Sequence, residues 1–85
     1  MAAGVLKVSV ISPEATLFEG EAPSVTAPAF DGEVGILPSH APMVTTLGAG
    51  VLRIGADEAR FDVAGGFMQV VDDVVRVVTE RATRI

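Results

Sequence analysis

Few side chains in this sequence have the chemistry of a nucleophile, a general base or a metal ligand. The 85 residues include no cysteine, one histidine (His40) and one lysine (Lys7). A metal site built on one imidazole needs carboxylates from distant loops, and a catalytic triad needs a third group that orients the histidine. Ser39 precedes His40, but neighbouring side chains on an extended chain point to opposite sides. We therefore expect no catalytic residue, no metal site, no cofactor and no disulfide partner.

Two further motifs have a simpler structural explanation. Asp72-Asp73 could form an acid pair, but two aspartates between valine runs are typical of a hairpin turn. The Gly48-Ala49-Gly50 segment begins like a dinucleotide-binding loop, yet Arg53 occupies the position of the third glycine and no helix is expected after it. Neither motif predicts an active site.

Lys7 raises one alternative class, the biotinyl and lipoyl carrier domains, which are also small, acidic and all-β. Such a domain presents its modified lysine at the tip of a hairpin. Lys7 lies instead within the alternating run Leu6–Val10, which predicts the middle of a strand. The sequence therefore favours a non-catalytic interaction module over a carrier domain.

Composition limits the remaining classes. Hydrophobic residues make up 49% of the chain, which is enough to form a small core and excludes intrinsic disorder. The net charge of −5, without a basic run, excludes a typical nucleic-acid-binding surface. Residues 34–52 carry no charged side chain, but their prolines and glycines would leave backbone groups unpaired in lipid, so we expect no insertion into the bilayer. The N-terminus has no basic and apolar regions of a signal peptide.

Apolar residues recur with a period of two along most of the chain, which is typical of strands with one buried face. The clearest case is Glu58–Val63, where Ala59, Phe61 and Val63 alternate with charged residues. We expect one all-β domain over residues 1–85, an antiparallel β-sandwich or flattened barrel of about eight to ten short strands. The predicted core contains Val8, Val10, Val25, Phe61, Val63, Val75 and Val77.

Turn residues divide the second half of the chain into short runs. Three hairpins are expected in succession, at Gly55–Asp57, Ala64–Gly66 and Val71–Val74, which together predict an antiparallel meander from about Val51 to Thr79. The only helical candidate is the tail, where Thr79 could cap a single turn over residues 80–85.

The order of these loops resembles a known family, the epsilon subunit of the bacterial F-type ATP synthase. The resemblance is carried by LKVSVISPEATLFEGEAPSVTAP at Leu6–Pro28 and DGEVGILPSHAPM at Asp31–Met43. GVLRI at Gly50–Ile54 and AGGFMQV at Ala64–Val70 agree with it, so it extends over nearly the whole chain. The family's N-terminal domain is a β-sandwich, as the period of two also predicts.

The resemblance implies a role without bond chemistry, in a subunit of the multi-subunit, proton-translocating ATP synthase. The domain would belong to the central stalk and couple proton flow to ATP synthesis, on the cytoplasmic face of the bacterial plasma membrane. Its implied partners are the gamma subunit and the polar loops of the membrane rotor ring. The segment Asp31, Gly32, Glu33 and Val34 matches the ring contact. Ser12, His40 and Thr45 match positions that meet gamma.

Each of these residues also has an ordinary structural explanation. Glu33 could be a solvated charge at a strand edge, and Ser12 could simply end a strand before Pro13. His40 could serve loop packing, and Thr45 could be an ordinary strand position.

The sequence departs from the family pattern in three ways. Ser39 stands where the family commonly has glycine, which raises a question about the local backbone because a positive φ is unfavourable for other residues. Asp31 replaces a usual glutamate and has a shorter reach. The chain also ends at Ile85, whereas family members usually continue into a helical hairpin that carries the inhibitory and ATP-binding elements. With Met1 and no tag sequence, we expect a naturally short subunit without ATP affinity.

Overall fold

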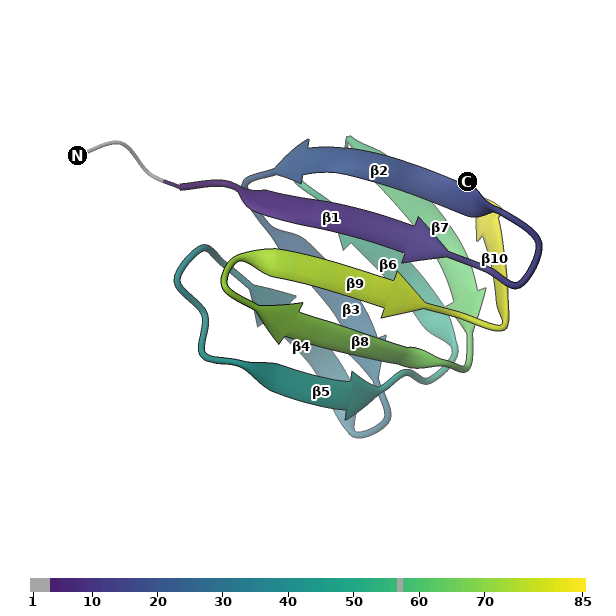
Figure 1. Ribbon diagram of the computed structural model, residues 1–85. Helices are drawn as coiled ribbons and strands as arrows, with labels where there is room; N and C mark the ends of the chain where they lie inside the picture. The colour runs from purple at the N-terminus through teal and green to yellow at the C-terminus, as the bar shows by residue number, and fades with distance from the viewer. Residues whose placement is uncertain (1–3, 57) are drawn as a thin grey trace.

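The computed structural model describes residues 4–56 and 58–85 of the chain (Figure 1). Within these residues the regular secondary structure consists of ten β-strands and no helix. This confirms the all-β prediction and the upper end of the expected strand number. The strands are β1 (Leu6–Ile11), β2 (Thr16–Ala22), β3 (Val25–Ala29), β4 (Gly32–Ile36), β5 (Met43–Thr46), β6 (Gly50–Ile54), β7 (Ala59–Ala64), β8 (Phe67–Val71), β9 (Val74–Val78) and β10 (Arg81–Arg84).

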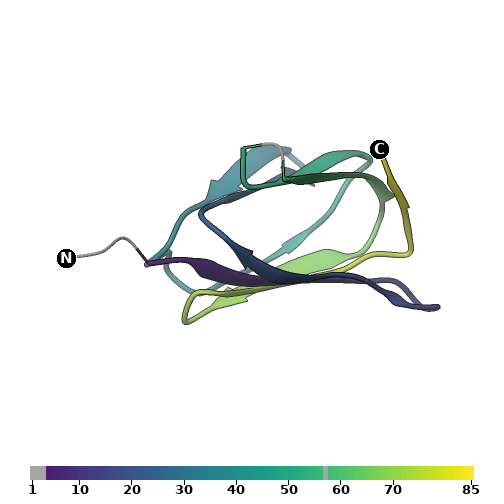
Figure 2. The same ribbon diagram turned by 90° about the horizontal axis from the view of Figure 1, so that it is seen from above.

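The strands form two five-stranded sheets that lie face to face (Figure 2). Sheet A has the order β2-β1-β9-β8-β5, and sheet B has the order β10-β7-β6-β3-β4. The pairings are antiparallel except for β1 and β9, which run parallel in the middle of sheet A. The sandwich prediction is therefore confirmed, with one parallel pair that the sequence pattern did not indicate.

The core lies between the sheets and uses alternate positions of the strands. All seven predicted core residues are at most 2% exposed. Val8 and Val10 of β1 are register partners of Val75 and Val77 of β9, so four valines form one buried patch of sheet A. The buried set is wider than predicted and includes side chains larger than valine from both sheets: Leu6, Ile36, Leu52, Ile54 and Met68.

The expected meander is wrong at its second turn. β6 pairs with β7 in sheet B and β8 pairs with β9 in sheet A, so the chain crosses between the sheets at Ala64–Gly66. Gly65 and Gly66 have φ values of 75° and 104°, which turn the chain out of sheet B. The first hairpin is supported by the pairing of β6 and β7, although Asp57 lies outside the described residues.

The expected helical turn at the C-terminus is also wrong. β10 pairs antiparallel with β7, and Ala82 faces Val63 in register. Thr79 is not a helix cap but a buried residue, 1% exposed, whose Oγ1 lies 3.0 Å from the carbonyl oxygens of both Gly65 and Arg81. A free sheet edge at β7 offers the tail more backbone hydrogen bonds than one isolated helical turn could make.

The uncharged segment from residue 34 to residue 52 contributes parts of β4, β5 and β6. Within residues 4–56 and 58–85, the structure contains no helix with the length and hydropathy needed to cross a membrane.

Candidate functional site

The acidic segment predicted to contact the rotor ring forms the turn between β3 and β4. Ala29 pairs with Gly32 and Pro28 with Glu33, so β4 begins directly after a tight turn. Gly32 has a φ of 132°, which a residue with a Cβ rarely adopts. Asp31, Gly32 and Glu33 are exposed, whereas Val34 is half-buried against the core. The turn therefore presents two carboxylates to solvent at one end of sheet B.

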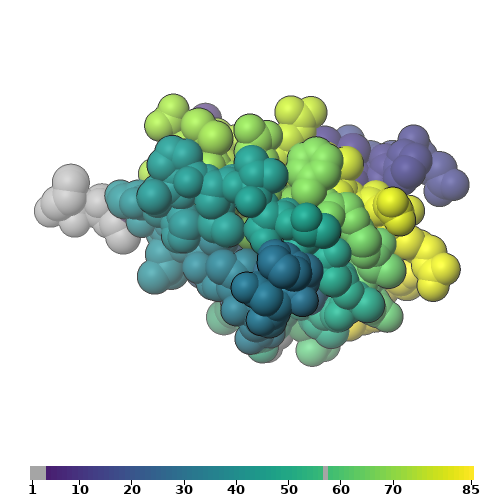
Figure 3. All heavy atoms as spheres, turned by 90° about the horizontal axis from the view of Figure 1, so that it is seen from below, coloured from purple at the N-terminus to yellow at the C-terminus, as the bar shows by residue number. Residues whose placement is uncertain are grey.

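This turn is attached to the opposite sheet by its backbone. Phe30 N–H donates to the carbonyl oxygen of Thr46 at 3.1 Å, and Gly48 N–H donates to that of Pro28 at 2.8 Å. An isolated bridge between Ala29 and Leu47 lies beside these bonds. The β3–β4 turn and the end of β5 are therefore joined by backbone bonds, on the side of the molecule viewed in Figure 3.

Phe30 is the most exposed large apolar side chain of the described residues, at 73%. It precedes Asp31 in the turn, and neither sheet covers it. Phe30 was not among the predicted contact residues, although a large apolar residue inside a turn signal is itself a sign of an exposed side chain. An aromatic ring beside two carboxylates gives this end of the domain both apolar and anionic contact groups.

Thr45 lies on β5, at the edge of sheet A. It is the register partner of buried Met68, is itself half-buried, and places Oγ1 3.4 Å from the carbonyl oxygen of Thr46. Its neighbour Val44 points the other way and is 68% exposed. The alternation of inward Met43 and Thr45 with outward Val44 could have identified Val44 as the more accessible side chain.

Ser12 follows β1 and closes a short turn with Ala15. Ser12 N–H donates to the carbonyl oxygen of Ala15 at 2.9 Å, Ala15 N–H donates back to that of Ser12 at 3.3 Å, and Ser12 Oγ also donates to Ala15 O at 3.3 Å. Beside this turn is a hollow of about 370 Å³ with a mainly apolar wall. Its lining residues are Ile11, Ser12, Pro13, Gly66, Phe67, Val78, Thr79 and Glu80.

His40 lies in the loop between β4 and β5. Its Nδ1 is 2.6 Å from the carbonyl oxygen of Ala41. Because a carbonyl only accepts, Nδ1 carries the proton in this contact, and in the neutral ring Nε2 keeps its lone pair. The preceding Ser39 has a φ of 71°, and its N–H donates to Oδ1 of Asp73 at 2.6 Å. Ser39, which stands where the family commonly has glycine, therefore has the left-handed backbone conformation that favours glycine.

The predicted contact residues fall into two groups. Thr79 N–H, after β9, donates to Ile11 O at 2.9 Å, and Leu47 N–H, after β5, donates to Gly66 O, before β8, at 2.9 Å. Because Phe67 of β8 pairs with Val78 of β9, the ends of β1 and β5 lie at the same end of sheet A. Ser12 and the β3–β4 turn thus share one end of the sandwich. His40 lies at the opposite end, beside the β8–β9 turn, where Lys7 N–H binds Asp73 O at the start of β1. The structure therefore separates His40 from Ser12 along the strand direction.

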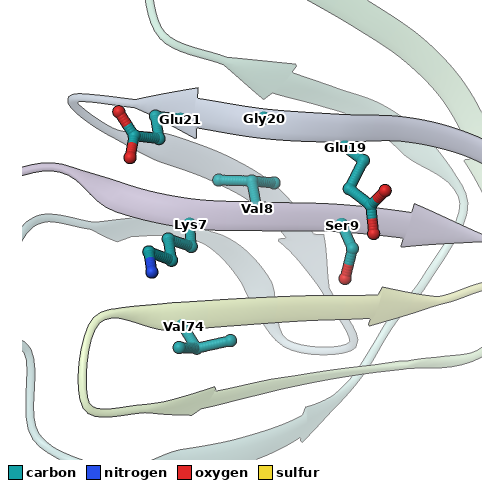
Figure 4. Close-up of a pocket in the computed structure, with 7 residues that line it drawn as sticks. All are labelled: Lys7, Val8, Ser9, Glu19, Gly20, Glu21 and Val74. Atoms are coloured by element: carbon teal, nitrogen blue, oxygen red, sulfur yellow. The ribbon is translucent and has the colours of Figure 1, made fainter.

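The remaining chemical candidates have structural positions. Asp72 and Asp73, with φ values of 51° and 63°, are the central residues of the two-residue turn between β8 and β9, as predicted. Lys7 lies near the start of β1, between Glu21 of β2 and Val74 of β9, over a shallow groove of about 340 Å³ (Figure 4). It does not occupy a hairpin tip, as a carrier lysine would. Among the described residues, no three ligand side chains form a group that could hold a metal ion.

Comparison with known proteins identifies close relatives of the chain. It is 46% identical over 82 residues to the ATP synthase epsilon chain of Leptospira interrogans, an alignment that covers 94% of this chain and 65% of the relative. The corresponding protein of Rhodopirellula baltica is 47% identical over 79 residues, which cover 91% of this chain and 62% of the relative. The chain thus spans less than two thirds of the length of these relatives.

Solved structures share the fold. A chain in the Euglena gracilis mitochondrial ATP synthase (OSCP/F1/c-ring) superposes with a TM-score of 0.85 at 23% identity, covering 94% of this chain and 53% of that one. A chain in the central stalk/c-ring structure of Tetrahymena thermophila mitochondrial ATP synthase gives 0.81 at 15% identity, covering 98% and 69%. The family model described as "ATP synthase, Delta/Epsilon chain, beta-sandwich domain" matches residues 5–85. This chain is a member of the ATP synthase delta/epsilon β-sandwich family.

Proposed function

We propose that this domain is a non-catalytic part of the central stalk of an F-type, proton-translocating ATP synthase. In this role it docks the gamma subunit to the membrane rotor ring and couples proton flow to ATP synthesis. The domain is peripheral, on the cytoplasmic face of a bacterial plasma membrane. The family match over residues 5–85 carries the proposal, and the names of the bacterial relatives support it.

The ring contact is assigned to Asp31, Gly32, Glu33 and Val34. A surface that contacts polar loops during rotation needs exposed polar groups on a rigid backbone. The β3–β4 turn has both properties, because its carboxylates are exposed and its backbone is bonded to the end of β5. One exposed ion pair contributes only about 0–1 kcal/mol, so Glu33 alone cannot hold the complex.

The gamma contact is assigned to Ser12, His40 and Thr45. Their separation along the strand direction suits a long partner that lies across the sandwich better than a peptide bound at one point. The apolar hollow beside Ser12 would take an apolar side chain of gamma. At the other end, Nε2 of neutral His40 is available as a hydrogen-bond acceptor.

The proposal is tested with the 85-residue chain and the gamma subunit of the same organism. Both proteins are purified and mixed, and size-exclusion chromatography with light scattering measures the mass of the product. We expect a complex with one copy of each chain. Two folded proteins that elute separately at micromolar concentration would contradict the proposal. A double variant, Ser12→Trp with His40→Ala, should weaken the complex while Glu58→Ala, on the β6–β7 connection, leaves it unchanged.

A further inference from the structure

The loop that carries His40 contains a strained residue. His40 N–H donates to the carbonyl oxygen of Leu37 at 3.2 Å, which closes a turn with Pro38 and Ser39 at its centre. Proline at the first central position and a φ of 71° at Ser39 are the features of a type II turn. The second central position of such a turn favours glycine, because a side chain there is unfavourable. Ser39 therefore needs a compensating interaction to keep this conformation.

Asp73 supplies that interaction from a distant part of the sequence. Its Oδ1 accepts a hydrogen bond from Ser39 N–H at 2.6 Å, a short contact to a charged acceptor. The bond links residues 34 positions apart and joins the β4–β5 loop to the β8–β9 turn. In Figure 1 both connections lie at the same end of the molecule.

Asp73 is itself held firmly in place. Its carbonyl oxygen accepts a bond from Lys7 N–H at 2.8 Å, and its neighbour Val74 is the register partner of Lys7 in the parallel pair β1–β9. Asp73 is half-buried, whereas the adjacent Asp72 is exposed. Both aspartates have a positive φ, but it is Asp73 that accepts the hydrogen bond from the loop. The backbone of Asp73 is thus bonded to β1 where the central strands β1 and β9 begin, at the end of sheet A.

We propose that Asp73 is a positioning residue that fixes the Leu37–His40 turn and thereby presents His40 to the gamma subunit. The role for gamma rests on the proposed function, whereas the fixing of the turn does not. Residue 39 is not glycine, and the hydrogen bond to Asp73 stabilises the positive φ that glycine would adopt freely. The bond also tethers the turn to the central strands. The loop that carries His40 is then held by the β8–β9 turn of sheet A as well as by the two edge strands it connects, β4 and β5.

The experiment compares glycine substitutions at the two adjacent aspartates of the whole chain. Asp73→Gly removes the acceptor, and Asp72→Gly is its matched control, because glycine adopts a positive φ freely at either position. Hydrogen exchange of the Ser39 amide, followed by NMR, reports on the turn without any partner. We expect exchange in Asp73→Gly to be about tenfold faster than in the original chain and exchange in Asp72→Gly to be unchanged.

Affinity for gamma supplies the second readout. Asp73→Gly should weaken binding by about threefold to tenfold, the equivalent of one net hydrogen bond, and Asp72→Gly should not. Asp73→Asn keeps an acceptor oxygen and should retain most of the affinity. Adding Ser39→Gly to Asp73→Gly should restore part of it, because glycine stabilises the type II turn without the tether.

Unchanged Ser39 exchange in Asp73→Gly, or equal effects of the two glycine substitutions, would overturn the proposal. If the original chain does not bind gamma at all, the proposed function and the presentation of His40 fail together. The exchange rates would still decide whether Asp73 fixes the turn, so the two failures are distinguishable.

Discussion

The guanidinium carbon of Arg84 lies 5.7 Å from the centroid of the Phe61 ring, so the last strand places a cation over the largest side chain of the core. Arg84 and Phe61 are register partners in β10 and β7. This cation–π contact adds to the backbone pairing of β10 with β7, and Arg84 itself remains exposed to solvent.

Loss of the Phe61 ring should be strongly destabilising. Phe61 is 1% exposed, so Phe61→Ala should lower the free energy of unfolding by about 3–5 kcal/mol, measured by urea denaturation. Arg84→Ala should lower it by about 0.5–1 kcal/mol through the lost ring contact. Arg81→Ala, in the same strand, is the control and should change it by less than about 0.5 kcal/mol. A cost below about 1 kcal/mol for Phe61→Ala would contradict the register of β7.

Gly66 should tolerate no side chain. A Cβ at Gly66 would overlap the carbonyl oxygen of Val78 and lie 2.7 Å from Cα of Thr79, and the φ of 104° is itself unfavourable. Gly66→Ala should therefore destabilise the domain by more than about 3 kcal/mol or prevent folding, as seen by circular dichroism and thermal melting. Gly35→Ala is the control, because a Cβ there has no atom within 4 Å. Equal melting temperatures of the two variants would show that the sheet crossover is misplaced.

The hydrogen bonds of the buried Thr79 hydroxyl should contribute more to stability than the volume of the side chain. Thr79→Val keeps the shape but removes the contacts to Gly65 O and Arg81 O and the acceptor for Arg81 N–H, so it should cost about 1–3 kcal/mol in chemical denaturation. Thr83→Val, on exposed β10, should be nearly neutral. Amide exchange should also become faster in β10. A neutral Thr79→Val variant would mean that water satisfies these carbonyl groups equally well.

Substitution of Glu33 should weaken the coupling between ATP hydrolysis and proton pumping without changing the folding of the chain. In the complete ATP synthase, Glu33→Ala should lower the number of protons pumped per ATP hydrolysed while the melting temperature of the isolated chain stays unchanged. Glu33→Lys should have a larger effect if the ring loop it meets is cationic, since attraction becomes repulsion. Glu19→Ala, exposed on β2 of the other sheet, is the control. Normal coupling in both Glu33 variants would remove Glu33 from the proposed ring contact.

The local part of the fold could be predicted from the sequence, because alternation of side chains is a property of a strand by itself. Phe61, Val63, Val75 and Val77 were placed in the core on that basis, and all are buried. The crossover at Ala64–Gly66 could not be predicted in this way. A glycine pair can close a hairpin or carry the chain to another sheet, and the choice depends on Leu47 and Val78, which lie far away in sequence.

The same limit applies to the tail and to the candidate site. β10 forms because β7 offers it a free edge, and nothing within Glu80–Ile85 indicates that edge. The exposure of Glu33 follows from its turn and could be anticipated. The inward orientation of Thr45 and the tether between Ser39 and Asp73 depend on register and on tertiary contacts.

The parallel pairing of β1 with β9 has a consequence for the order of folding. β1 can pair with its sequence neighbour β2 early, but its other edge stays open until β9, which ends at Val78, is available. The local hairpins β1–β2, β3–β4, β6–β7 and β8–β9 can form earlier, because their loops close over few residues. Pairing of such distant segments gives a high contact order and slow folding. Until then, the edge of β1 that will face β9 has unpaired backbone groups and is open to association with other chains.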